Sequence, residues 1–359
     1  MNRVARRERL QAVMADRDLA GFIVSAPSNV RYLTGYTGSN GLVCLGTAPR
    51  FMTDFRYATS VAALAADWEV EIVQQSLLGD VAKRIPEVFG AERIGFEAAA
   101  LSYSAWKALD EAARAAGAEL VPCEQVVEDL RAVKDADEIA LIRAGGELCD
   151  AIYAWLADEG LAGREEREVG WAIERKAREL GAEGASFPPI VASGANGALP
   201  HAVPGPLEID RSTLVVLDLG TLVNGYCSDC TRTFATGPSE PQMMDVYEAV
   251  LRAQEAALAL VAPGQDCQEV HETARRVIGE AGYGEFFNHG TGHGVGIDMH
   301  EEPRFRNGFG GTLHPGNVVT VEPGIYLPGR FGVRIEDLVL VTEDGYEVLT
   351  RFPKSLLSV

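Results

Sequence analysis

Four carboxylates interrupt stretches of sequence that otherwise have the apolar, β-branched pattern of buried strands. They are Asp218 in VVLDLG, Asp229 in YCSDCTRTF, Glu322 in VVTVEPG and Glu336 in GVRIEDLVLV. Acidic residues are depleted in strands, and an ionised carboxylate among apolar side chains needs a partner or a metal ion. The chain must therefore fold so that each of these acids finds one.

The spacing of the four acids arranges them in pairs. Asn224-Gly225 is a strong signal for a short hairpin turn, and a turn there makes the two aspartates diagonal neighbours on one face. A second hairpin, centred on Gly329 within LPGRFG, places the two glutamates directly opposite each other. If the two hairpins meet, four carboxylates share one site, and like charges that close cannot all remain ionised without cations.

The alternative is that each acid is satisfied separately. Each could be solvated on an edge strand, or paired with a nearby arginine such as Arg232 or Arg334. For one acid this explanation is as good as a metal site. For four acids in two hairpins of matching design, a shared site is the better explanation.

The histidines supply a further ligand type. Three of the six lie in the glycine-rich stretch NHGTGHGVGIDMH, as His289, His293 and His300. The glycines argue against a helix and allow the backbone to approach a crowded site, with His293 at its centre. A single histidine is more often a core residue, but the cluster favours a functional role for His293. His201, alone in the loop LPHAVPG, reads by itself as structural.

Four carboxylates and one imidazole form a hard, oxygen-rich ligand set. Such a set suits divalent manganese, cobalt or iron, and zinc also fits. Four negative ligands balance two divalent cations, so two ions are expected. Two neighbouring metals can hold a bridging hydroxide as nucleophile and polarise a carbonyl, which predicts amide hydrolysis without a protein nucleophile.

The rest of the chain predicts two domains and a linker. Alternating strand and helix patterns indicate an α/β domain over residues 1–125, with strands at Gly21–Ser25, Leu42–Leu45, Val70–Val73 and Arg93–Phe96 and helices at Arg56–Ala66 and Ser102–Ala116. The charged stretch 126–137 is the expected linker. Residues 138–359 form an α+β domain, with helices from near Glu138 and at Arg164–Leu180, Gln242–Val261 and Asp266–Glu280.

The ordered set of acids and histidine resembles the pita-bread metallopeptidases, which include methionine aminopeptidase, aminopeptidase P and prolidase. The matching residues are Asp218, Asp229, His293, Glu322 and Glu336, in the frames VLDLG, CSDCTRTF, GTGHGVG, TVEPGIY and VRIED. The resemblance implies an α/β creatinase-like domain followed by an α+β pita-bread (creatinase/aminopeptidase-like) catalytic domain. It also implies that Asp218 binds one ion and that Asp229 and Glu336 bridge both. His293 and Glu322 would complete the second site, with Glu322 also relaying a proton.

The amino-terminal domain points to the prolidase and aminopeptidase P branch, because methionine aminopeptidases usually lack such a domain. MHEEPRF is similar to small prolidases, which implies that His300 contacts the scissile amide and that Arg304 binds the substrate carboxylate. His201 occupies the position of a substrate-side histidine in the family. The resemblance therefore implies that His201 is catalytic, together with Glu322 and His300, rather than structural. His289 falls near the proline pocket, for which Phe187, Tyr226 and Tyr326 are candidates.

The net charge and the cysteine content limit which partners and which cellular compartment are expected. The net charge of −20 disfavours nucleic acid and anionic membranes as partners. No apolar run approaches the roughly 20 residues needed to span a bilayer, and the start reads as an amphipathic helix rather than a signal peptide. Six scattered cysteines in a chain of 359 residues are not a disulfide framework, which predicts a cytoplasmic protein.

These observations favour an Xaa-Pro dipeptidase that acts on small proline-containing peptides with two divalent ions, manganese first. The alternative is aminopeptidase P, which releases the first residue of longer Xaa-Pro peptides with the same ligands. A metal-free creatinase-like relative or a non-catalytic binding protein is more remote, because those lose metal ligands. A homodimer is implied by the resemblance alone.

Overall fold

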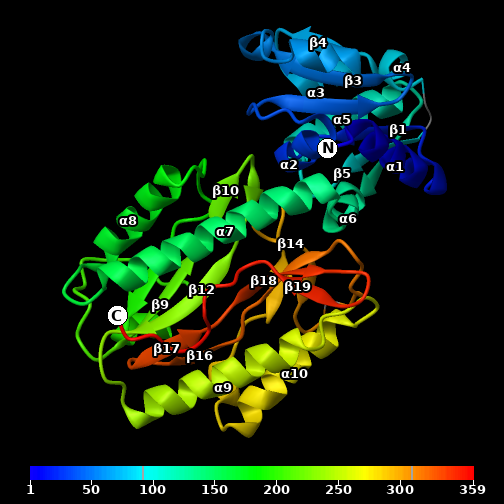
Figure 1. The fold of residues 1–359 in the computed structure, drawn as a ribbon. Coiled ribbons are helices and arrows are strands. Elements are labelled where there is room, and N and C mark those ends of the chain that lie inside the picture. The colour runs from blue at the N-terminus through cyan, green and yellow to red at the C-terminus, as the bar shows by residue number, and fades with distance from the viewer. Residues whose placement is uncertain (91–92, 309) are drawn as a thin grey trace. The chain divides into compact units, whose positions relative to one another are not determined.

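The computed structural model describes residues 1–90, 93–308 and 310–359. The chain divides into two compact units, Met1–Arg131 and Ala132–Val359 (Figure 1). Each unit has its own hydrophobic core. Within the described ranges, no helix is both long and apolar enough to cross a membrane.

The first unit is built on one mixed sheet of six strands in the order β4-β3-β2-β1-β5-β6. Strands β1, β5 and β6 run parallel, as do β3 and β4, whereas β2 runs antiparallel to both of its neighbours. The strands are β1 (Gly21–Val24), β2 (Gly41–Leu45), β3 (Pro49–Asp54), β4 (Glu69–Val73), β5 (Arg93–Glu97) and β6 (Glu119–Cys123). The helices are α1 (Arg3–Asp16), α2 (Pro27–Thr34), α3 (Leu77–Lys83), α4 (Ile85–Val88), α5 (Tyr103–Ala115) and α6 (Val126–Ala132).

The strands and the serine-capped helix predicted for this unit are confirmed. Oγ of Ser102 accepts a hydrogen bond from the Ala105 amide at the start of α5. The helix predicted over Arg56–Ala66 is wrong, because this stretch forms only two short 3₁₀ segments, Phe55–Tyr57 and Ala62–Ala66. Neither segment buries a residue, so no apolar face holds a longer helix against the core.

The second unit places its strands between two pairs of helices (Figure 1). Helices α7 (Ala136–Glu159) and α8 (Glu166–Glu179) pack on one side, and α9 (Pro241–Leu258) and α10 (Cys267–Glu280) on the other. The sheet orders are β14-β13-β15-β18-β19, β12-β9-β8, β11-β10-β7 and β16-β17. These strands are β7 (Gly184–Ala185), β8 (Ile190–Ser193), β9 (Leu214–Leu219), β10 (Thr221–Val223), β11 (Tyr226–Cys227), β12 (Cys230–Ala235), β13 (Gly292–Gly294), β14 (Glu301–Phe305), β15 (Val318–Val321), β16 (Gly324–Leu327), β17 (Phe331–Arg334), β18 (Asp337–Val341) and β19 (Tyr346–Val348).

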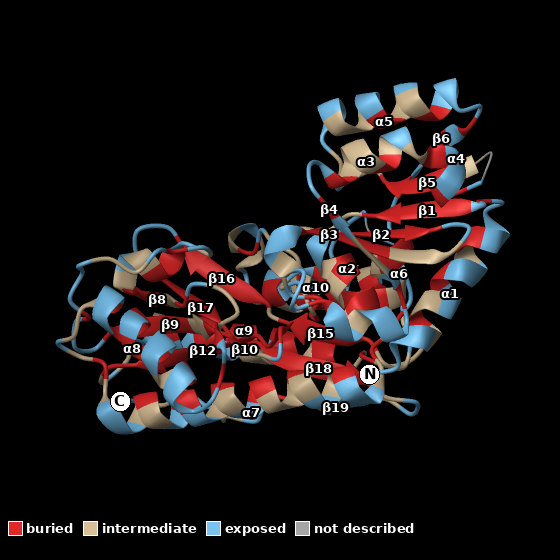
Figure 2. Ribbon diagram, turned by 90° about the horizontal axis from the view of Figure 1, so that it is seen from above, coloured by how far each residue is buried: buried red, intermediate tan, exposed pale blue. Residues whose placement is uncertain are grey.

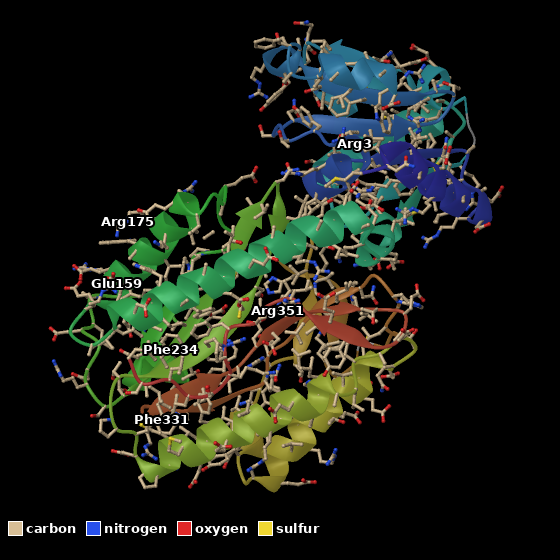
Figure 3. The ribbon with its side chains drawn as sticks, viewed as in Figure 1. Arg3, Glu159, Arg175, Phe234, Phe331 and Arg351 are labelled. Carbon is tan, nitrogen blue, oxygen red and sulfur yellow. The ribbon has the colours of Figure 1, made fainter. Side chains whose placement is uncertain are left out.

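Burial explains why acids in these strands are so constrained. Strands β12, β15, β16, β17 and β18 are buried at every position, whereas the helices expose one face (Figure 2). Phe234 on β12 and Phe331 on β17 are among the fully buried side chains (Figure 3). A carboxylate in this environment has little access to water, so the protein or a bound cation must satisfy it.

The first predicted hairpin and its register are confirmed. Thr231 on β12 pairs with Asp218 on β9, and the same register continues through β10 and β11 to a turn at Asn224-Gly225. Both turn residues have positive φ, at 45° and 71°, as a tight hairpin turn of this kind requires. Asp229 lies directly before β12, in the break between two strand ladders, as a diagonal neighbour of Asp218.

The second predicted hairpin is confirmed as well. Gly324 pairs with Arg334 in the ladder of β16 and β17, and Val321 pairs with Asp337 in the ladder of β15 and β18. Glu322-Pro323 and the residues opposite them separate the two ladders, which continue in the same register on both sides. Glu322 and Glu336 therefore face each other across this gap.

The two hairpins meet, which was the condition for a shared site. In the gap, the Glu336 amide donates to the carbonyl of Thr231, at 3.1 Å, instead of to its own hairpin. Oγ1 of Thr231 donates to Oε2 of Glu336, at 2.7 Å. The Glu322 amide likewise donates to the carbonyl of Thr291, at 2.7 Å, which draws the glycine-rich segment toward the same place.

Candidate metal centre and substrate cavity

A cavity of about 580 Å³ lies within the second unit, at the meeting point of the two hairpins. Its lining combines apolar side chains with acids, imidazoles and guanidinium groups. Eight of the nine residues given a metal, catalytic or substrate role from the sequence line it, namely Asp218, Asp229, His293, Glu322, His201, His289, His300 and Arg304. A cavity with an apolar wall and a few converging polar groups is the usual form of a small-molecule site.

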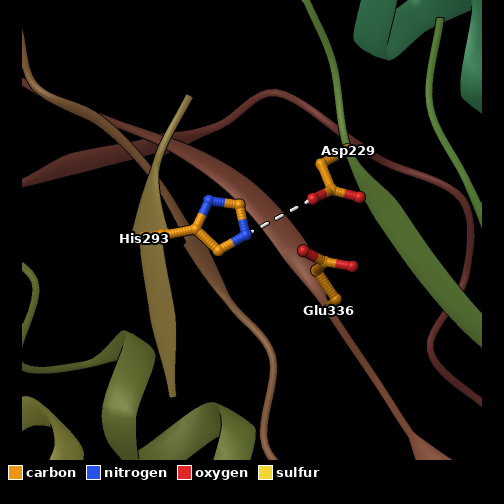
Figure 4. Close-up of side chains that lie close together, drawn as sticks. All are labelled: Asp229, His293 and Glu336. Carbon is orange, nitrogen blue, oxygen red and sulfur yellow. Dashed lines mark ion pairs between the residues drawn. The ribbon is translucent and has the colours of Figure 1, made fainter. Parts of the chain in front are cut away.

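Three predicted ligands converge closely. Asp229, His293 and Glu336 each offer a ligand atom within 4.8 Å of the other two (Figure 4). Nε2 of His293 lies 3.6 Å from Oδ2 of Asp229 and 3.5 Å from Oε1 of Glu322. Asp218 stands on the neighbouring strand β9, diagonal to Asp229, so the structure brings all five residues to one place.

Several carboxylate oxygens in this cluster lack a partner within the part of the chain that the structure describes. Oδ1 of Asp218, Oδ1 of Asp229 and Oε1 of Glu336 are buried and have no hydrogen-bond partner among the described residues. Leaving such atoms unsatisfied is costly, whereas a cation would satisfy them together. The residues therefore fit divalent metal ions, and the oxygen-rich donor set suits hard or borderline ones.

The pKa values of the acids in the cluster also indicate a metal site. Burial, increased by the neighbouring carboxylates, raises the pKa of Asp229 and of Glu336 well above the ordinary values. Burial raises the pKa of Glu322 to about 7, with Arg334 opposing and Asp218 adding to the shift. In the absence of metal, therefore, these acids keep their protons to higher pH than ordinary carboxyl groups do, and a bound cation would displace those protons.

His293 is prepared as a neutral ligand. Burial lowers its pKa to about 4, so the ring is uncharged near neutral pH. Its Nδ1 lies 3.0 Å from the carbonyl of Gly294, which can only accept, so Nδ1 carries the proton. The lone pair of Nε2 then faces Asp229 and Glu322, the orientation in which ligating histidines are usually held.

Arg334 belongs to the site, although the sequence indicated it only as one of two arginines that could pair with the acids. Its Nη2 donates to Oδ2 of Asp218, at 2.7 Å, so this pairing satisfies one oxygen of one acid. Arg232 instead binds Asp337, at 2.9 Å. The signal was present in VRIED, because residues two apart on a strand share a face and Glu336 follows Arg334 by two.

His289 lines the cavity with both ring nitrogens already engaged. Its Nδ1 lies 2.7 Å from the carbonyl of Gly290, and its Nε2 lies 3.1 Å from the hydroxyl of Tyr326. That hydroxyl accepts from Nη1 of Arg334, at 2.8 Å, so it donates its proton to His289. Burial lowers the pKa of His289 to about 3, and the neutral ring forms part of the cavity wall.

The residues expected on the substrate side also surround the cavity. The ring of His300 lies 4.4 Å from that of His293, centre to centre, and Arg304 is paired with His293 across β13 and β14. Nε of Arg304 lies 3.2 Å from Oε1 of Glu302. His201 is exposed at the cavity, and Arg306, which the sequence reasoning missed, lines it too.

Of the three candidates for the proline pocket, Phe187 is a lining residue. Tyr326 lies behind the wall, in the hydrogen-bond chain described above. Tyr226 donates to Oε1 of Glu138 on α7, at 3.0 Å, and so supports the helix rather than the cavity. Sequence alone could not separate these aromatic residues, because it does not show which side chains face the cavity.

Comparisons with known proteins agree with this geometry. The model of metallopeptidase family M24 matches residues 140–343, and the model of the creatinase/prolidase N-terminal domain matches residues 6–133. An uncharacterized peptidase of Bacillus subtilis is 37% identical over 351 residues, covering 98% of this chain and 99% of that protein. The Xaa-Pro dipeptidase of Pyrococcus furiosus is 35% identical over 359 residues, covering 98% of this chain and 99% of that protein.

Solved structures are similar over the same extent. An Xaa-Pro dipeptidase from Bacillus anthracis superposes with a TM-score of 0.95 at 37% identity, covering 100% of both chains. An X-Pro aminopeptidase from Thermotoga maritima gives a TM-score of 0.85 at 32% identity, covering 96% of this chain and 99% of that one. The similar structures therefore include both activities that the sequence left as alternatives.

Proposed function

This chain belongs to metallopeptidase family M24, and from that premise we propose that it is an Xaa-Pro dipeptidase, which hydrolyses the bond before proline in small peptides. One observation carries the proposal: three buried carboxylate oxygens lack partners among the described residues, and two of their acids, Asp218 and Asp229, line a cavity that is also lined by imidazoles and guanidinium groups. The carboxylate oxygens suit metal ions, and the imidazole and guanidinium groups suit a small peptide with a free carboxylate.

We propose that two divalent ions occupy the site, manganese first, with cobalt, zinc and iron as alternatives. Asp218 would hold one ion, Asp229 and Glu336 would be shared, and His293 with Glu322 would hold the other. When bound, such ions activate a water molecule and polarise the scissile carbonyl. Four carboxylates balance two dications, which supports this number.

The remaining polar residues of the cavity would bind and orient the peptide. Arg304 would bind the carboxylate of the proline, and His300 would contact the scissile amide beside His293. Glu322 would take up and return the proton of the attacking water. His201, exposed at the cavity, is assigned to the substrate side and to the chemical step.

His289 and Phe187 would contribute to the proline pocket. His289 offers its ring as a wall, because both of its nitrogens are engaged within the protein. A proline nitrogen in a peptide bond carries no hydrogen, so the pocket needs no acceptor for it and an apolar wall suffices.

Arg304 and Arg306 favour the dipeptidase over aminopeptidase P. Both line the cavity, so positive charge is present where a dipeptide ends in a carboxylate and a longer peptide continues as a neutral amide. A metal-free relative is disfavoured because all five ligand residues are present. A homodimer and a cytoplasmic location remain predictions, and the six buried cysteine thiols suit a reducing compartment.

The test is the release of amino acids from an Xaa-Pro dipeptide and an Xaa-Pro-Xaa tripeptide, after chelation and after manganese or cobalt is returned. Metal-dependent cleavage of the dipeptide alone is the expected result. Cleavage mainly of the tripeptide would establish aminopeptidase P instead. Inertness toward both, or full activity of Asp229→Ala and Glu336→Ala variants, would refute the proposal.

A further inference from the structure

A buried ion pair holds the start of the strand that carries Arg304. Nζ of Lys134 lies 3.1 Å from Oε2 of Glu301, and the two side chains are only 1% and 6% exposed. Glu301 is the first residue of β14 and directly follows His300. Neither member of the pair is among the described residues that line the cavity. The pair therefore acts on the site through the backbone.

The carboxylate of Glu301 also closes the turn that presents His300. Its Oε1 accepts the Asp298 amide at 3.0 Å, while the Gly296 amide donates to the carbonyl of Asp298 at 3.1 Å. A side chain at Gly296 would place its Cβ 2.6 Å from both carboxylate oxygens, so only glycine leaves them room. The turn from Gly296 to His300 is thus folded around one buried negative charge.

The lysine is fixed from a different direction. Its amide donates to the carbonyl of Gly316, at 2.9 Å, and its neighbour Val133 bridges to Asn317. The residue after it, Asp135, caps the first turn of α7 by accepting the Glu138 amide at 3.0 Å. The backbone of Lys134 is therefore held by the start of α7 and by the segment just before β15, independently of the turn that leads into β14.

We propose that Lys134 is a positioning residue for substrate binding. Through Glu301 it sets the position of His300 and Arg304 together, because one precedes Glu301 and the other follows it on the same short strand. The roles of His300 and Arg304 rest on the function proposed above. Without the cation of Lys134, the buried carboxylate must become protonated or move toward water, and either change displaces the turn.

Two measurements test this proposal on the full-length, manganese-loaded protein. The first is amide hydrogen exchange of peptides that cover Gly296–Phe305, with peptides of α9 and α10 as internal references. The second is the ratio of kcat/KM for an Xaa-Pro dipeptide to that for its Xaa-Pro amide, which lacks the carboxylate that Arg304 would bind. Thermal melting is followed alongside, so that loss of stability is measured separately.

The variants are Lys134→Met, Glu301→Gln and the two combined. Arg143→Met is the matched control, because Arg143 on α7 forms a half-buried ion pair with Glu347 on β19 and does not line the cavity. Lys134→Met is expected to speed exchange only in Gly296–Phe305 and to lower kcat/KM for the dipeptide by roughly tenfold or more, mainly through KM. The amide substrate should be affected less, so the ratio falls.

The double variant is expected to restore most of both readouts. The neutral side-chain amide introduced by Glu301→Gln needs no counter-ion, and its oxygen can still accept from Asp298. A double variant no better than Lys134→Met would mean that the lysine does not act through Glu301, and would overturn the proposal. If Lys134→Met fails to fold, Glu301→Gln alone must speed exchange in the same peptides.

A purely structural role predicts something else: a lower melting temperature with unchanged exchange and an unchanged substrate ratio, as expected for Arg143→Met. That result would also overturn the proposal. A wild-type protein inert to Xaa-Pro peptides would refute the proposed function instead. Hydrogen exchange would then decide the positioning role by itself.

Discussion

Nη2 of Arg334 lies 2.7 Å from Oδ2 of Asp218, within a site where four carboxylates converge. The guanidinium is buried and also donates to Thr231, to Tyr326 and to the carbonyl of Pro200. It therefore offsets part of the negative charge whether or not metal is present. The other oxygen of Asp218, Oδ1, stays buried and without a hydrogen-bond partner among the described residues.

Replacing this arginine should separate its structural and metal-binding effects. Arg334→Met leaves Asp218 buried without its cation, so the metal-free protein should lose about 3–5 kcal/mol of unfolding free energy. Bound metal should recover part of this loss, because it supplies positive charge at the same place. Urea unfolding with and without manganese measures both values. Arg330→Met, on the exposed turn of the same hairpin, is the control, and equal losses in the two variants would contradict the prediction.

The stabilisation that bound metal provides should grow as pH rises. In the metal-free protein the pKa values of Asp229, Glu322 and Glu336 are raised, to about 7 for Glu322, so the folded state keeps protons that the unfolded chain has lost. The raised pKa values of these acids therefore lower metal-free stability as pH rises from the ordinary carboxyl range, about 4, through 7, whereas the lowered pKa values of His289 and His293, about 3 and about 4, raise it up to the ordinary histidine range, about 6.5. Metal binding requires the deprotonated acids, so the stabilisation by metal should grow over the same interval.

Melting temperatures at pH 5, 6, 7 and 8, with manganese and with chelator, test this dependence. The difference between the two curves should be small at pH 5 and largest at pH 8. A difference that is independent of pH would mean that these carboxylates do not bind the metal.

Arg304 should recognise the substrate carboxylate. Arg304→Ala is expected to lower kcat/KM for an Xaa-Pro dipeptide by roughly 10- to 100-fold, the effect of losing a hydrogen bond to a charged group. Cleavage of the corresponding Xaa-Pro amide should change little. Arg276→Ala, exposed on α10, is the matched control. Equal losses on both substrates would show that Arg304 supports the fold of the site rather than the carboxylate.

The hydroxyl of Tyr326 should matter more than its ring. Tyr326→Phe leaves Nε2 of His289 and Nη1 of Arg334 without this partner, at an expected cost of about 1–3 kcal/mol in unfolding free energy. Metal content, measured by elemental analysis, should not change, but KM for proline peptides should rise as the His289 wall loosens. Tyr247→Phe removes a hydroxyl that donates to the carbonyl of Lys354, and it should lower stability without changing KM.

The two hairpins could be predicted from the sequence because each one is determined by residues close together in the chain. Asn224-Gly225 and Gly329 adopt the positive φ values that tight turns need, and the turns then determine which acids face each other. The prediction of a helix over Arg56–Ala66 was wrong because no apolar face of this stretch packs against the core. Contacts such as Lys134 with Glu301, 167 residues apart, depend on how separate elements pack and have no local signal.

The two strand ladders of the second hairpin keep one register across the gap that holds Glu322 and Glu336. Two residues separate the ladders on each strand, so the number of residues on the two sides is matched. Inserting or deleting one residue in either half of the gap would turn every later side chain on that strand to the opposite face. Relatives of this chain whose second hairpin has another length should therefore differ at the turn around Gly329, where residues can be added without disturbing the acids.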